Sequence, residues 1–61
     1  MYVIKRDDGG YVMSYNSDFD MLEIIFDKGA ARIFDTLGEA QNARADLSEI
    51  APLRTFTIEK I

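Results

Sequence analysis

The sequence contains no cysteine and no histidine among its 61 residues. The absence of cysteine excludes disulfides and thiolate metal sites, and the absence of histidine removes the commonest zinc and iron ligand. A chain of this length buries only about 60% of the surface that its unfolded form exposes. We therefore expect a compact apolar core, which self-association could extend.

Long hydrophobic runs are also lacking, and no stretch approaches the length that spans a bilayer. In the N-terminal segment Met1–Arg6 the charges follow the short apolar part, the reverse of a secretory signal, so we expect a cytoplasmic protein. The net charge of −4 disfavours nucleic acid and anionic membranes as partners. The hydrophobic fraction of 48% indicates a folded chain rather than a disordered one.

A hairpin is predicted for residues 2–6 and 11–16, because Asp8-Gly9 favours a two-residue type I′ turn. This turn pairs Arg6 with Tyr11 and Ile4 with Met13, and it leaves one face mostly apolar. We expect that face to cover the core.

Four further segments are predicted outside the hairpin and the helix. Residues 21–26 predict a third strand that carries apolar side chains on both faces. Asp27 can cap one helical turn over residues 27–30, and residues 31–34 form a short extended piece. Alternating side chains over residues 54–61 predict a terminal strand.

A helix is predicted after Asp35, with Thr36 as its N-cap and Glu39 completing a capping box. Pro52 ends this helix, because the residue before a proline is disfavoured in helical conformation. The apolar stripe with a repeat of 3.6 residues consists of Leu37, Ala40, Ala43, Leu47, Ile50 and Ala51.

The fold class that follows is α+β in a single domain over residues 1–61. A small antiparallel sheet, a β-meander of three or four strands, has one helix packed on one face, and a C-terminal strand follows in the order β-β-β-(β)-α-β. We expect the last strand beside the first. The predicted core residues are Tyr2, Ile4, Met13, Leu22, Ile24, Phe26, Ile33, Phe34, Ala40, Leu47, Ile50, Phe56 and Ile58.

The stretch Ala31–Ala40 leads from Ala-Arg-Ile-Phe directly into the capped helix, and Phe56–Ile61 closes the chain as a strand. In these segments the sequence resembles small proteins of phages and prophages that have a β-meander, one helix and a last strand. The resemblance implies the same fold and a phage or prophage accessory factor. It carries over no functional residues, because most of those proteins have no assigned function.

Catalysis has little support in the sequence. The serines have no histidine to activate them, and a small chain has little room for a pocket beside its core. Asn16, Asp18, Asp20 and Asp27 follow a calcium-loop spacing, but Met21 stands where such a loop requires glycine. We therefore expect no enzyme, no metal site and no cofactor.

A nucleic-acid-binding module is the alternative function. It would use the bases and tyrosines of the first hairpin, together with arginines that could gather near one end. These residues are Lys5, Arg6, Tyr2, Tyr11, Tyr15, Arg32, Arg44 and Arg54. Loss of retention on Lys5→Glu or Arg32→Glu would indicate this function.

An acidic row on the predicted helix lies opposite its apolar stripe. Glu39, Asp46 and Glu49, with Asn42 between them, recur at spacings of three and four. Such a row could mimic a phosphate backbone, although an amphipathic helix presents a solvated face of this kind by default.

The sheet face that the helix leaves uncovered is the main functional candidate. On the predicted register it holds Val3, Val12, Met21 and Ile25, which together would form an apolar contact surface. We therefore expect a small non-enzymatic interaction protein, with a homodimer or an unknown protein partner bound at this face or at a free strand edge.

Overall fold

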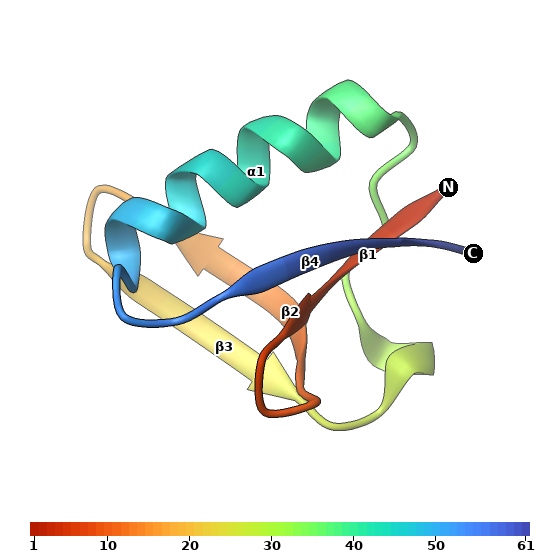
Figure 1. Cartoon of the computed structure of the whole chain (residues 1–61), viewed down its shortest axis with the longest axis horizontal. Coiled ribbons are helices and arrows are strands. Elements are labelled where there is room, and N and C mark those ends of the chain that lie inside the picture. The colour runs from red at the N-terminus through yellow and green to blue at the C-terminus, as the bar shows by residue number, and fades with distance from the viewer.

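The computed structural model describes all residues 1–61 and has an α+β architecture with one helix packed on a four-stranded sheet (Figure 1). All strand pairs are antiparallel and the order is β3-β2-β1-β4. The elements are β1 (Tyr2–Arg6), β2 (Tyr11–Asn16), β3 (Met21–Ile25), the 3₁₀ turn η1 (Lys28–Ala30), α1 (Leu37–Ile50) and β4 (Phe56–Lys60). The predicted fold class and the placement of the last strand beside the first are confirmed.

The β1–β2 hairpin has a longer loop than the sequence predicted. The N–H of Gly9 donates to the carbonyl of Arg6 at 3.0 Å, and the N–H of Arg6 donates to the carbonyl of Gly10 at 2.7 Å. Gly9 has a φ of 92°, which makes this a three-residue loop with glycine in the left-handed position. Lys5 consequently lies opposite Tyr11, and the predicted pairing of Arg6 with Tyr11 is wrong.

This one-residue difference moves side chains to the opposite face of β2. Val12 joins Ile4 in the core beneath the helix. A β-bulge between Val12 and Ser14 leaves Met13 with 37% of its surface exposed. The expectation that Met13 faces the core is therefore wrong, and Val12 takes that role.

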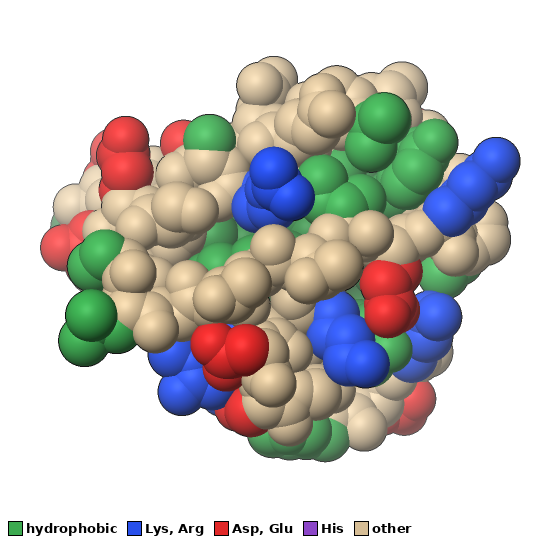
Figure 2. All heavy atoms as spheres, viewed as in Figure 1, with side chains coloured by type: hydrophobic (Ala, Val, Ile, Leu, Met, Phe, Trp, Pro, Cys, Tyr) green, Lys and Arg blue, Asp and Glu red, His purple; other side chains and the backbone are tan.

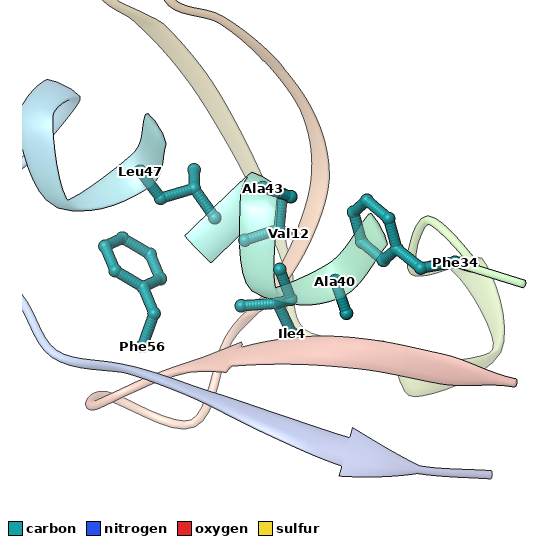
Figure 3. Close-up of a cluster of buried hydrophobic side chains, with 7 residues drawn as sticks. All are labelled: Ile4, Val12, Phe34, Ala40, Ala43, Leu47 and Phe56. Carbon is teal, nitrogen blue, oxygen red and sulfur yellow. The ribbon is translucent and has the colours of Figure 1, made fainter. Parts of the chain in front are cut away.

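The core lies between α1 and the sheet (Figure 3). Its fully or nearly buried members are Ile4, Val12, Phe34, Ala40, Ala43, Leu47 and Phe56. Leu47 and Phe56 face each other at the C-terminal end of the helix, and Phe34 packs beside Ala40 at the other end. Alanines on the inner face of α1 let the helix approach the sheet closely.

Several predicted core residues are confirmed only as half-buried neighbours of this cluster. They are Tyr2, Leu22, Ile24, Ile50 and Ile58. Phe26 is 69% exposed and Ile33 is 51% exposed, so both are wrong as core predictions. Phe26 lies just past the end of β3, and Ile33 lies next to Phe34, which takes the buried position.

The helix begins and ends where the sequence predicts. The hydroxyl of Thr36 accepts the N–H of Glu39 at 3.1 Å, which satisfies one free amide of the first turn. The N–H of Ala51 donates to the carbonyl of Leu47 at 2.9 Å before Pro52 stops the helix. Asp27 caps η1 by accepting the N–H of Gly29, as predicted.

The connection between β3 and α1 fills a split in the sheet. β1 pairs with β2 next to the hairpin loop, but further along Tyr2 exchanges two backbone hydrogen bonds with Phe34, at 2.9 and 2.8 Å. The N–H of Arg32 donates to the carbonyl of Val12 at 3.0 Å. The connection is thus hydrogen-bonded to β1 and to β2, which it separates.

Candidate interaction surface

The four residues predicted to form an exposed apolar patch do not form one. Val3 and Val12 are fully buried, and Val12 belongs to the core under the helix. Ile25 is half-buried, and Met21 alone is well exposed, at 57%. The patch prediction is wrong because the hairpin register differs and because the β3–α1 connection crosses the helix-free face of the sheet.

A polar cluster around Glu59 occupies that helix-free face. The hydroxyl of Tyr11 donates to Glu59 Oε1 at 3.1 Å, and Lys28 Nζ lies 3.3 Å from the same oxygen. Lys5 Nζ lies 4.0 Å from Glu59 Oε2, and the ammonium of Lys28 also lies 5.9 Å from the centre of the Tyr11 ring. The cluster ties η1 to β1, β2 and β4 across this face.

The pKa of Glu59 reflects two opposing effects. Partial removal from water raises the pKa, whereas the hydrogen bonds from Tyr11 and Lys28 lower it. The hydrogen bonds and the two nearby ammonium groups outweigh desolvation, so the pKa lies below its ordinary value. The Glu59 carboxylate is therefore a charged group whose partners are already supplied by the chain itself.

A second cluster fastens the hairpin loop to the connection between α1 and β4. Asp8 accepts two hydrogen bonds from the Arg6 guanidinium, which together with Arg54 holds the pKa of the Asp8 carboxyl well below its usual range. Arg54 Nη2 lies 2.7 Å from Asp7 and 3.1 Å from Asp8. Asp7 also accepts the N–H of Thr55 at 2.8 Å. This cluster fixes the start of β4 relative to the end of β1.

These clusters bear on the residues that a nucleic-acid site would use. Lys5, Lys28, Arg6 and Arg54 are each paired with a carboxylate. The guanidinium of Arg32 lies 5.4 Å from the Tyr15 ring centre and 5.2 Å from that of Phe34. Lys5, Arg6, Arg32 and Arg54 thus have partners within the chain, whereas Arg44 is exposed on α1 and forms no ion pair.

The acidic residues of the predicted row lie on α1 but do not share one exposure. Glu39 and Glu49 are exposed on α1, and Asp46 is half-buried. Among the residues with calcium-loop spacing, the Asn16 side chain accepts the N–H of Asp18 at 3.0 Å and so closes the β2–β3 turn. No three acidic side chains converge in a geometry that could hold a metal ion, and the surface has no pocket.

The outer edge of β4 is the surface that sequence reasoning described least. The backbone groups of Tyr2 bond to Phe34, and those of Arg6 bond within the hairpin loop. Both residues therefore direct their N–H and C=O groups away from β4. In an antiparallel pair such residues alternate with those that bond to the neighbouring strand.

The same alternation determines which groups of β4 are free. Tyr2 lies opposite Lys60, Ile4 opposite Ile58, and Arg6 opposite Phe56. Because these pairs do not exchange hydrogen bonds, Phe56, Ile58 and Lys60 direct their backbone N–H and C=O groups to the open side of β4. β4 is at the edge of the sheet, so these groups have no strand partner.

Hydrophobic side chains border this free edge. Figure 2 shows them in the space between α1 and β4, with β4 lying in front. Among the apolar residues of these two elements, Ile58 of β4 is half-buried and Leu37 of α1 is exposed. A strand added to β4 would cover both free backbone groups and apolar surface. Two features of the sequence pointed to this edge: the alternating side chains of residues 54–61, which predict a strand, and the expected position of that strand beside the first one.

The β3 edge differs from the β4 edge in one respect. Glu23, at the centre of β3, is exposed, whereas the centre of β4 is the apolar Ile58. A charge in the middle of an edge strand discourages strand addition. Neither strand contains proline, and β4 carries its charges, Glu59 and Lys60, at its C-terminal end, so the centre of the β4 edge is the less protected of the two.

Comparisons with protein-family models, with curated proteins and with solved structures found no match for this chain. None of its helices is long and apolar enough to cross a membrane.

Proposed function

We propose that this chain is a small non-enzymatic interaction protein that acts by binding a protein partner along the free edge of β4. The observation that carries the proposal is the run of unpaired backbone groups at Phe56, Ile58 and Lys60 beside apolar surface. An extended segment that adds to a sheet edge gains main-chain hydrogen bonds, and side-chain contacts provide its specificity.

The neighbouring clusters favour this edge as a rigid template. Asp7 and Asp8 bind Arg54 at the start of β4, and Lys28 binds Glu59 near its end. A preorganised edge loses less conformational entropy on binding than a mobile one. Residues 31–40 and 56–61 resemble segments of small phage and prophage proteins. An accessory factor of that kind could act through such a surface.

Nucleic-acid binding is less well supported. Lys5, Lys28, Arg6 and Arg54 would have to give up carboxylate partners to reach phosphates, and the net charge of −4 opposes the approach. An electrophoretic mobility assay at low salt tests this alternative, because binding through phosphates weakens steeply as salt rises.

The test of the proposal uses a variant that changes the β4 edge and leaves the core residues unchanged. Lys60→Pro removes one outward-facing N–H, and proline is tolerated at strand edges where that N–H faces solvent. Lys60→Thr removes the same charge but keeps the N–H, so it is the matched control. We expect the wild type and Lys60→Thr to retain a partner from host lysate that Lys60→Pro loses.

The contact must also map to the edge. Backbone amide signals of the labelled protein that change on adding the identified partner should centre on β4. Retention of the partner by Lys60→Pro, or changes confined to the acidic row of α1, would contradict the proposal.

A further inference from the structure

We infer that the segment added to β4 is the β4 strand of a second copy of this chain, paired antiparallel about a two-fold axis at Ile58. The inference rests on the proposed function, because both use the same free edge. It goes further by naming the partner and the register.

The outward-facing groups of β4 are arranged symmetrically about Ile58. With the axis at this residue, Ile58 pairs with its own counterpart, and Phe56 pairs with Lys60 of the other copy. Phe56, Ile58 and Lys60 of one copy then each exchange backbone hydrogen bonds with an outward-facing residue of the other copy. The register therefore satisfies the whole free edge without changing the strand.

The side chains agree with this register. Two half-buried Ile58 side chains meet at the centre, on the face that carries α1. On the opposite face, Glu59 lies across from Thr57 of the other copy, so no like charges face each other directly. The Glu59 carboxylate is also bound by Tyr11 and Lys28 within its own chain.

Three other symmetric arrangements are less favourable. Moving the axis to Thr57 pairs Phe56 with Ile58 of the other copy but leaves the outward-facing groups of Lys60 without a partner. Moving the axis to Glu59 places two carboxylates directly opposite each other, which is destabilising. Pairing through β3 with the axis at its centre does the same with the exposed Glu23. The β4 pair centred on Ile58 avoids both contacts and places an apolar pair at its axis.

Sedimentation equilibrium of the purified protein, from low to high micromolar concentration, tests the partner. We expect the mass of the wild type to rise with concentration towards twice the 6.9 kDa of one chain. The Lys60→Thr variant should show the same rise. Lys60→Pro should remain monomeric with an unchanged circular dichroism spectrum, which excludes misfolding as the cause.

A charge pair at position 58 tests the register. Ile58→Lys and Ile58→Glu should each be monomeric, because each places like charges across the axis. An equimolar mixture of these two variants should form a heterodimer, an effect that loss of folding cannot produce. Because Ile58 packs against the core, circular dichroism must first show that both Ile58 variants are folded. A mixture of folded variants that stays monomeric, or a dimer that survives Lys60→Pro, would overturn the inferred interface.

The outcomes separate the two proposals. A wild-type protein that is monomeric at every concentration overturns the second copy as partner, while capture of another protein that depends on the β4 edge would still support the proposed function. A protein that neither dimerises nor captures another protein through the β4 edge would contradict both proposals.

Discussion

Replacing Gly10 by alanine should destabilise the protein through a steric conflict at the end of the hairpin loop. A Cβ at this position would lie 2.3 Å from Ile24 Cγ2, 3.2 Å from Phe26 Cζ and 3.3 Å from Asp8 Oδ1. Ile24 is branched at Cβ and half-buried in β3, so its methyl group cannot move away without changing rotamer or shifting the strand.

Overpacking of this kind costs about 1–3 kcal/mol. The free energy of unfolding of a chain this short is about 3–9 kcal/mol at the usual value per residue. Since 1 kcal/mol lowers the melting temperature of a small domain by about 4–8 °C, we expect Gly10→Ala to melt roughly 5–20 °C below the wild type.

Gly9→Ala is the matched control in the same loop. A Cβ at Gly9 meets no atom within 4 Å, but its φ of 92° disfavours any residue with a side chain, at a cost of about 1 kcal/mol. This variant therefore reports conformational strain without a steric conflict, and it should lose less stability than Gly10→Ala.

Ile24→Leu provides the decisive comparison, because leucine lacks the Cγ2 methyl group that the new Cβ would meet. Urea unfolding of the wild type, both single variants and the double variant Gly10→Ala/Ile24→Leu gives the coupling free energy. We expect the double variant to lose less than the sum of the single losses. Additive losses, or a Gly10→Ala variant no less stable than Gly9→Ala, would refute the steric argument.

Three further predictions concern the core, the helix cap and acid. Leu47→Ala empties the fully buried centre of the α1 face and should lower the free energy of unfolding by about 2–5 kcal/mol, enough to leave a large unfolded fraction by circular dichroism at room temperature. Thr36→Ala should cost about 1 kcal/mol in urea unfolding, whereas Thr36→Ser, which keeps the hydroxyl that accepts from Glu39, should cost little. Because the pKa of Asp8 is lower in the folded protein, its stabilising effect is fully present above the unfolded value of about 3.9 and is lost as the pH falls through the folded value. Asp8→Asn should therefore be less stable than the wild type at neutral pH and lose less on acidification, and melting temperatures that fall in parallel would contradict this assignment.

The elements that sequence analysis predicted correctly are those with local causes. The Thr36 cap, the apolar stripe and Pro52 determine the helix, and alternation determines the terminal strand. The hairpin register was wrong because Asp8-Gly9 fits a two-residue turn as well as a three-residue loop with Gly9 in the left-handed position. Nothing local distinguishes them, and the choice depends on Val12 packing under the helix.

The candidate site was harder to predict for the same reason. The burial of Val3 depends on a connection that is distant in sequence and crosses the helix-free face, which alternation within one strand cannot reveal. The free β4 edge depends only on strand order, and the expected neighbour of the last strand was right. What the sequence lacked was the direction of the β4 backbone groups, which follows from the bonds of Tyr2 and Arg6.

The connection between β3 and α1, which is hydrogen-bonded to both β1 and β2, also has a consequence for cooperativity. Since Tyr2 and Val12 bond to Phe34 and Arg32, the hairpin cannot complete its hydrogen bonds before the segment leading into the helix has docked. Local opening of the first strand must then release that segment too. Amide hydrogen exchange should accordingly give Tyr2 and Phe34 similar protection factors, because both amides become exposed in the same opening event.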